Sequence, residues 1–272
     1  MSIAEWVSLC EEATSERRRT CEVLREKARV TPTAFSENWE KIYKVLFSGK
    51  YISLSLERLQ ISDISPLAGF VNIVSLDLTD NQISDISPLG GLIKIRDLGL
   101  NYNRISDLTP LKGLTNLVNL GLMGNQISDL SPLANLKNIR RLYLEDNQIF
   151  SLMPLAGLTN LIVLYLLDNQ ISDISTLSRL TNLQYLGLES NQISDLSSLT
   201  ELINLTDLAL DHNQISDIYP LARLSKLTEL SLNNNQIYDL MPLVSLWCES
   251  NRDVSRMSEA KRDLSEFPHS FS

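Results

Sequence analysis

The sequence predicts an α/β solenoid with a parallel sheet along one wall. One observation is an asparagine that recurs every 22 residues, five times within the tract Asn-Gln-Ile-Ser-Asp. Another is that the apolar positions around this asparagine recur with the same step. A fixed period of this size is typical of a solenoid, in which each unit buries its apolar face against its neighbours. The recurring asparagines are Asn81, Asn103, Asn125, Asn147, Asn169, Asn191, Asn213 and Asn235.

Within one unit, residues 73–94, the spacing of the apolar residues changes once. Leu76 and Leu78 are two residues apart, which is typical of a strand because alternate side chains share one face. Ile83, Ile86 and Leu89 follow at steps of three, which favours a tight 3₁₀-like or irregular return over a long helix. We therefore expect short parallel strands on the concave wall and 3₁₀ or irregular segments on the convex side.

The asparagine column predicts a structural ladder. A buried amide without hydrogen bonds costs roughly 1–3 kcal/mol, so each side chain needs partners. An asparagine has two donor hydrogens and an acceptor oxygen, enough to bond its own turn and the next coil. One such residue per coil would form a continuous ladder, so we expect no catalytic role for the column.

Eight aspartates share one register in Ser-Asp-Ile-Ser-Pro-Leu and its variants. In the unit above, Ser87 precedes Pro88, which fits a helix cap followed by a first-turn proline. Asp85 lies two residues earlier and can accept hydrogen bonds from backbone amides of the turn. We expect turn chemistry rather than calcium binding. The aspartates are Asp63, Asp85, Asp107, Asp129, Asp173, Asp195, Asp217 and Asp239.

One coil carries the motif of a known family. Leu114-Thr115-Asn116-Leu117 leads to Leu120 and Leu122, then to Asn125-Gln126-Ile127-Ser128-Asp129 and Ser131-Pro132-Leu133. This pattern resembles the bacterial, internalin-like class of leucine-rich repeat proteins, over nine coils in residues 51–248. The resemblance implies a horseshoe-shaped solenoid that binds other proteins on its concave wall.

The N-terminal segment favours a cytoplasmic protein. It opens with Met1 and Ser2 and soon reaches charged residues, without the apolar core of a signal peptide. No run approaches the ~18 apolar residues of a membrane span. Cys10 and Cys21 would lie about 16 Å apart along an unbroken helix, so free buried thiols in a reducing compartment are expected for these and Cys248. A secreted, internalin-like surface ligand is the alternative.

The two ends of the chain are expected to cap the solenoid. Residues 1–50 predict two helices, whose apolar stripes would cover the first coil, although a docking or dimerisation surface is the alternative. Residues 249–272 predict a C-terminal cap or tail. The first stripe contains Ile3, Trp6, Val7, Cys10, Ala13, Cys21, Leu24 and Ala28, and the second contains Phe35, Trp39, Ile42, Tyr43 and Leu46.

Charge is concentrated in the coils. They hold 11 basic and 20 acidic side chains, which accounts for the net charge of −9 of the whole chain. Acids not used in turns fall mostly at positions expected on the concave wall. Such a surface repels phosphate groups, so we expect neither nucleic acid nor an anionic membrane as partner, but a protein with a basic or mixed surface.

An apolar patch interrupts this acidic wall near the middle of the array. In residues 161–167 every side chain is hydrophobic, although only Leu161, Leu164 and Leu166 are needed for the core. Val163, Tyr165 and Leu167 should therefore point outward as anchors for a protein partner, with acids and two arginines around them. The predicted anchors are Tyr143, Val163, Tyr165, Leu167 and Tyr185, and the predicted flanking residues are Glu145, Asp146, Asp168, Glu189, Arg140 and Arg141.

Residues for enzymatic chemistry are sparse. His212 and His269 are the two histidines, and neither has other metal ligands at a suitable spacing. Lys50 follows Gly49 as in a phosphate loop, but the other residues of that motif are missing. We expect a monomeric, non-enzymatic interaction module without metal or cofactor. The alternative is a scaffold or self-assembly protein that acts through its terminal helices.

Overall fold

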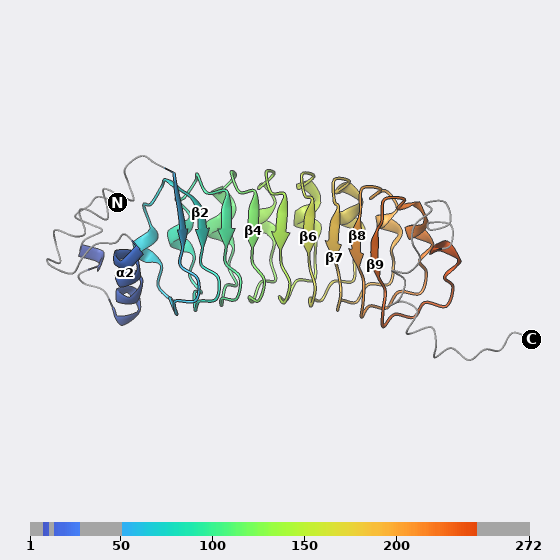
Figure 1. Ribbon diagram of the computed structural model, residues 1–272, viewed down its shortest axis with the longest axis horizontal. Coiled ribbons are helices and arrows are strands. Elements are labelled where there is room, and N and C mark those ends of the chain that lie inside the picture. The colour runs from blue at the N-terminus through green and yellow to red at the C-terminus, as the bar shows by residue number, and fades with distance from the viewer. Residues whose placement is uncertain (1–7, 11–13, 28–50, 244–272) are drawn as a thin grey trace, which may run out of the picture.

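Nine short parallel strands form one sheet, in the order in which they occur in the sequence (Figure 1). The computed structural model describes residues 8–10, 14–27 and 51–243. The sheet lines the concave wall of an elongated solenoid, as expected for the horseshoe fold. Its strands are β1 (Ile52–Ser55), β2 (Ile73–Asp77), β3 (Asp97–Gly99), β4 (Asn119–Gly121), β5 (Arg141–Tyr143), β6 (Val163–Tyr165), β7 (Tyr185–Gly187), β8 (Asp207–Ala209) and β9 (Glu229–Ser231).

The register of the sheet follows the 22-residue period. Leu98 of β3 pairs with Leu76 of β2 on one side and with Leu120 of β4 on the other. Side chains on either side of this central leucine therefore form columns that cross the strands. Neighbours in a column are about 4.8 Å apart, the spacing of strands in a sheet.

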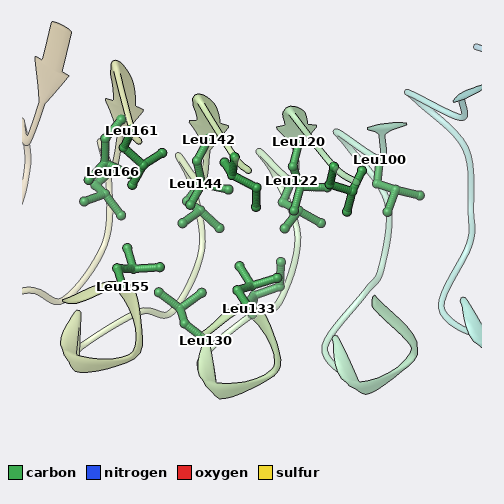
Figure 2. Close-up of a cluster of buried hydrophobic side chains, with 14 of the residues drawn as sticks. Leu100, Leu120, Leu122, Leu130, Leu133, Leu142, Leu144, Leu155, Leu161 and Leu166 are labelled. Atoms are coloured by element: carbon green, nitrogen blue, oxygen red, sulfur yellow. The ribbon is translucent and has the colours of Figure 1, made fainter. Parts of the chain in front are cut away.

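The opposite wall consists of short 3₁₀ helices. They are η1 (Ser65–Leu67), η2 (Ser87–Leu89), η3 (Thr109–Gly113), η4 (Ser131–Leu133), η5 (Met153–Gly157), η6 (Ser175–Arg179), η7 (Ser197–Leu199) and η8 (Tyr219–Arg223). Leucines from the strands and from this wall point into the space between the two, as Figure 2 shows for Leu120 and Leu133 of one coil, both fully buried. The core is therefore one continuous column of aliphatic side chains.

The cap predicted at Ser87 is wrong. Ile86 occupies the cap position of η2 and makes no side-chain capping bond, while Ser87 is the first residue of the helix. The capping oxygen comes from Asp85, whose Oδ1 accepts a hydrogen bond from the N–H of Ser87 at 2.8 Å. The other seven aspartates of this register accept the same bond from the residue two positions on. The N–H and the hydroxyl of Ser131 together hold the pKa of Asp129 below its usual value.

Each asparagine of the ladder ties two coils together. The Oδ1 of Asn169 accepts the N–H of Ile149 at 2.9 Å, and its Nδ2 donates to the carbonyl oxygens of Leu144 and Leu166 at 3.0 and 3.1 Å. Ile149 and Leu144 belong to the preceding coil. The expectation that the amide bonds the next coil is therefore wrong. The asparagine side chain bonds the preceding coil instead, because the turn at the end of the strand directs it there.

The residue before each ladder asparagine adopts a left-handed backbone conformation. Asp168 has a φ of 52°, and Gly124 has a φ of 65° in the corresponding place. This conformation turns the chain sharply at the end of the strand, which brings the asparagine side chain inward. The other residues before a ladder asparagine with this conformation are Asp80, Tyr102, Asp146, Ser190, His212 and Asn234, and Arg58 adopts it before Leu59 in the first coil.

At the N-terminal end, helix α2 (Ser15–Lys27) packs against the first coil. The hydroxyl of Thr20 donates to the carbonyl oxygen of Asp63 at 2.6 Å, and Arg17 pairs with the carboxylate of Asp63 at 2.9 Å. Figure 1 shows this helix beside the first strands. Val23 and Leu24 are buried.

The expectation of free thiols at Cys10 and Cys21 is wrong. The two cysteines form a disulfide with their Cα atoms 5.9 Å apart, because the helical segment at residues 8–10 is not continuous with α2. The expectation assumed one unbroken helix. Cys248, the second N-terminal stripe from Phe35 to Leu46 and the C-terminal cap or tail lie outside the described residues.

Candidate functional site

The middle of the concave sheet carries two tyrosines in one column. Tyr143 of β5 pairs in register with Tyr165 of β6, and their ring centroids are 5.8 Å apart at an interplanar angle of 44°. Tilted rings at this distance attract each other through their quadrupoles. Both rings are partly exposed, so they form an amphipathic surface with the hydroxyl groups available to a partner.

A glycine in the next strand makes room for Tyr165. Gly187 pairs in register with Tyr165, and a Cβ atom on Gly187 would lie 2.7 Å from Cδ1 of the tyrosine ring. The same Cβ atom would lie 3.0 Å from Oε2 of Glu189. The ring of Tyr165 and the carboxylate of Glu189 therefore meet over Gly187. The spacing of apolar residues in the sequence does not predict this contact between Tyr165 and Glu189.

Val163 does not have the exposure that the sequence predicts. It lies in the expected column, between Arg141 of β5 and Tyr185 of β7, but only 8% of its surface is exposed. The two larger neighbours cover its short side chain. Tyr185 itself is 39% exposed and Leu167 is partly exposed, so these two extend the apolar surface around Tyr165.

Glu145 is expected on the rim of this surface, and it is instead buried, with 7% of its surface exposed. Its Oε2 has no hydrogen-bond partner among the described residues, and the same holds for Oε2 of Glu189. Desolvation, with a further contribution from the charge of Glu189, raises the pKa of Glu145. Desolvation and the nearby charges of Asp211, Asp207 and Asp168 likewise raise the pKa of Glu189. A cation placed between the two carboxylates would relieve both effects.

Desolvation also raises the pKa of Tyr165, and Asp207, Tyr143, Glu145 and Glu189 add to the shift. The tyrosine hydroxyl therefore stays protonated at physiological pH and can donate a hydrogen bond. The phenol, the buried Glu145 and the half-buried Glu189 thus form one polar cluster.

Asp146 and Asp168 lie outside the strands. Both belong to the left-handed turn positions that follow the strands, and both are exposed. They therefore form a solvated acidic rim beside the tyrosines, whereas Glu145 and Glu189 lie closer to the sheet. The difference in depth coincides with the left-handed turn, where Asp146 and Asp168 are exposed while the asparagines that follow them turn inward.

Arg141 is tied to the sheet by its neighbours. Its Nη1 donates to Oδ1 of Asn119 at 3.3 Å, and Nδ2 of Asn119 donates to Oδ1 of Asp97. This chain of three residues runs along one column across β3, β4 and β5. Arg140, expected beside Arg141 at the flank of the patch, instead lines a separate groove described below.

A second acidic pair lies toward the C-terminal end of the sheet. Asp207 of β8 pairs in register with Glu229 of β9. Desolvation raises the pKa of Asp207, and the carboxylate of Glu229 adds to the shift by charge and by hydrogen bonding. Charge alone does not predict this pair, because the contact depends on the register of β8 and β9.

The described residues show no arrangement typical of metal chemistry. Among them, no group of three or more histidine, cysteine or acidic side chains is placed to hold a metal ion. The Nε2 of His212 lies 3.0 Å from Nδ2 of Asn234 in the next coil, so this ring is engaged in a surface hydrogen bond. In the part of the chain that the structure describes, no helix is long and apolar enough to cross a membrane.

Comparison with protein families identifies the repeat. The model described as Leucine Rich repeats (2 copies) matches residues 71–113, 93–135, 115–157, 159–201 and 203–245, more than half of the chain. No curated protein matches the sequence.

Several solved structures are similar to this one. The internalin InlF from Listeria monocytogenes has 33% sequence identity and a TM-score of 0.73, over 84% of this chain and 72% of that chain. The internalin C2 (InlC2) from the same organism has 45% identity and a TM-score of 0.63, over 67% of this chain and 79% of that chain. The plant peptide hormone receptor RGFR1, solved in complex with RGF2, shares the fold at 23% identity and a TM-score of 0.61, over 69% of this chain and 32% of that chain.

Proposed function

Since the chain belongs to the internalin-like leucine-rich repeat proteins, we propose that it is a non-enzymatic module that binds another protein on its concave face. The observation that carries this proposal is the tyrosine pair, Tyr143 and Tyr165, together with Leu167 and with Oε2 of Glu145, which has no hydrogen-bond partner among the described residues. Tyrosines with one apolar face and one polar end are frequent energetic anchors of protein interfaces. A buried carboxylate oxygen without a hydrogen bond is costly in the free protein, and a donor on a partner would relieve that cost.

The partner is expected to present a lysine or arginine to this site. Such a cation would pair with Glu145 and Glu189 and lie against the ring of Tyr165. The exposed rim, with Asp146 and Asp168, would steer a basic surface toward the site. In such a complex, the tyrosines and Leu167 would supply most of the affinity, and the acidic residues would supply selectivity for a basic partner.

One solved structure with this fold was determined as a complex. The receptor RGFR1 was solved with RGF2, so a solenoid of this fold can hold a binding partner. The partner of this chain can be identified by affinity capture.

Affinity capture from the source cell, with matched tyrosine variants, tests the proposal. Tyr165→Glu places a carboxylate within the anchor surface, whereas Tyr219→Glu places one on η8, where Tyr219 is 72% exposed. We expect one specific protein to be lost with Tyr165→Glu and retained with Tyr219→Glu, with thermal melting unchanged in both variants. Capture that survives Tyr165→Glu would place the interface elsewhere, including at the N-terminal helix.

Salt provides a second check on the same complex. Exposed charges are screened once the Debye length falls below ~10 Å, so steering by the acidic rim should weaken above 0.1 M salt. The association rate should therefore fall with salt, while the dissociation rate changes less. A complex whose association rate is independent of salt would contradict the role of the rim.

The disulfide favours a second candidate, a secreted surface ligand. Disulfides persist in oxidising compartments and are rare in the cytoplasm, and Cys10 and Cys21 form one. A cytoplasmic location remains a prediction. Cell fractionation, with alkylation of free thiols before lysis, separates the two: labelled Cys10 and Cys21 in the cytosolic fraction support the cytoplasmic module, and unlabelled cysteines in the medium support the secreted ligand.

A further inference from the structure

A groove with basic side chains lies outside the concave acidic surface. It has a volume of about 770 Å³ and is open to solvent at the edge of the sheet where the strands begin. Lys94, Arg96 and Arg140 line it, and all three are exposed. The protein carries a net charge of −9, so three cations without an acid among the lining residues mark a local reversal of sign.

The floor of the groove is held in place by the backbone. The N–H of Arg96 donates to the carbonyl oxygen of Val74, that of Val118 to Arg96, and that of Arg140 to Val118, each at 2.8 Å. These four residues therefore form one column across four coils, in which valine and arginine alternate. At about 4.8 Å per coil, the Cα atoms of Arg96 and Arg140 are roughly 10 Å apart, with Val118 between them.

A second asparagine ladder forms the wall of the groove. The Nδ2 of Asn116 donates to the carbonyl oxygen of Ile93, and that of Asn138 donates to that of Thr115, both at 2.8 Å. The Nζ of Lys94 donates to Oδ1 of Asn72 at 2.8 Å, which orients the ammonium group. Hydrogen bonds thus hold Lys94, Asn116 and Asn138 in place along the groove.

The two arginines are not paired within the described protein. Among the residues that the structure describes, no carboxylate lies within 4.0 Å of the guanidinium of Arg96 or Arg140, although other arginines do form such pairs. Their donors are available to an external acceptor. Planar guanidinium groups bind carboxylates in a bidentate manner.

We propose that this groove binds an extended acidic segment of a second protein, with carboxylates on Arg96 and Arg140 and an apolar side chain on Val118. In a polyproline II segment, residues three apart share one face and are about 9 Å apart, which matches the spacing of the two arginines. The exposed ring of Tyr51 extends the apolar surface at one end. Val118 lies between the two arginines and favours a peptide over a sulfated polysaccharide or a nucleic acid. Those polyanions have no aliphatic group to place on the valine between their negative charges.

This site is independent of the proposed concave site. It prefers acidic partners, whereas the concave surface prefers basic ones, and the two share no residue. One protein could therefore bridge two partners of opposite charge.

Fluorescence anisotropy of a labelled peptide with the full-length protein tests the proposal. The probe is a nonapeptide with glutamate at every third position and proline and valine between, and the control peptide carries glutamine in place of glutamate. The double variant Arg96→Gln/Arg140→Gln removes the paired cations. The matched variant Arg104→Gln/Arg179→Gln removes the same charge from exposed arginines outside the groove.

We expect the acidic peptide to bind the wild type and the matched variant equally, and the groove variant about tenfold more weakly. Tyr165→Glu should leave this binding unchanged, which separates it from the concave site. Thermal melting shows that each variant is folded. Equal binding by both double variants would overturn the proposal, and so would a heparin-derived oligosaccharide that binds the groove more tightly than the peptide.

Discussion

The rings of Tyr143 and Tyr165 lie 5.8 Å apart in neighbouring coils, 22 residues apart in the chain. Register alone brings them together, because both follow the central strand leucine directly. Their contact links the stacking of the coils to the surface that we propose for binding.

The tyrosine contact should be measurable as a coupling energy. In a double-mutant cycle of Tyr143→Ala and Tyr165→Ala, we expect an interaction of about 0.5–1.5 kcal/mol in the free energy of unfolding. Denaturant unfolding of the two single variants and the double variant gives this value. Strictly additive changes would show that the rings do not stabilise each other.

The ladder asparagines should be far more costly to remove than the exposed asparagines of the second ladder, to which Asn182 belongs together with Asn116 and Asn138. Asn169→Ala leaves the N–H of Ile149 and two carbonyl oxygens without their side-chain partner, and we expect a loss of about 2–4 kcal/mol. Asn182→Ala removes one exposed bond to the carbonyl of Thr159 and should cost below about 1 kcal/mol. Similar losses for both, measured by urea unfolding, would contradict the burial-based account.

The buried carboxylate of Glu145 should make stability depend on pH. Burial raises its pKa in the folded protein above the unfolded value, so its contribution to stability is fully present below the unfolded pKa. That contribution is lost as the pH rises through the folded pKa. Glu145→Gln should therefore be more stable than the wild type at pH 8, by about 1 kcal/mol, and the difference should shrink toward pH 4.

Asp146→Asn is the matched control for this experiment, since Asp146 is exposed in the same coil. It should change stability at pH 8 by less than about 0.5 kcal/mol. A Glu145→Gln variant that is less stable than the wild type at pH 8 would show that the charged carboxylate has a stabilising partner.

The left-handed position before the ladder asparagine should tolerate alanine poorly. Gly124 has a φ of 65°, and a Cβ atom there would lie 2.5 Å from Cδ1 of Tyr102. We expect Gly124→Ala to lower stability by about 1–2 kcal/mol. Gly113→Ala, where a Cβ atom would meet nothing within 4 Å, should be neutral or slightly stabilising. Thermal melting of the two variants tests this difference. Equal melting temperatures would contradict the prediction that alanine is strained at position 124.

The fold could be predicted from the sequence because the period is strict. Once Leu76 and Leu98 are 22 residues apart with strand spacing around them, the register of the sheet and the position of the core follow. The disulfide could not be predicted in the same way. Apolar spacing suggests that Cys10 and Cys21 share a helix, but it carries no signal for the break between them.

The sequence predicts on which face of the sheet the residues of the candidate site lie, but it does not predict how deeply each one is buried. The alternation along a strand gives the face on which Val163 and Tyr165 lie. How far each is exposed depends on the sizes of side chains in neighbouring coils, and Arg141 and Tyr185 cover Val163. The basic groove was missed because its arginines lie at the strand edge, two coils apart in the sequence.

Hydroxyl-radical footprinting of the tyrosines, with and without the captured partner, tests the central claim most directly. The concave site predicts that Tyr143, Tyr165 and Tyr185 become protected in the complex, while Tyr219 on η8 is oxidised at the same rate as in the free protein. Protection of Tyr219 with unchanged oxidation of Tyr165 would contradict the account.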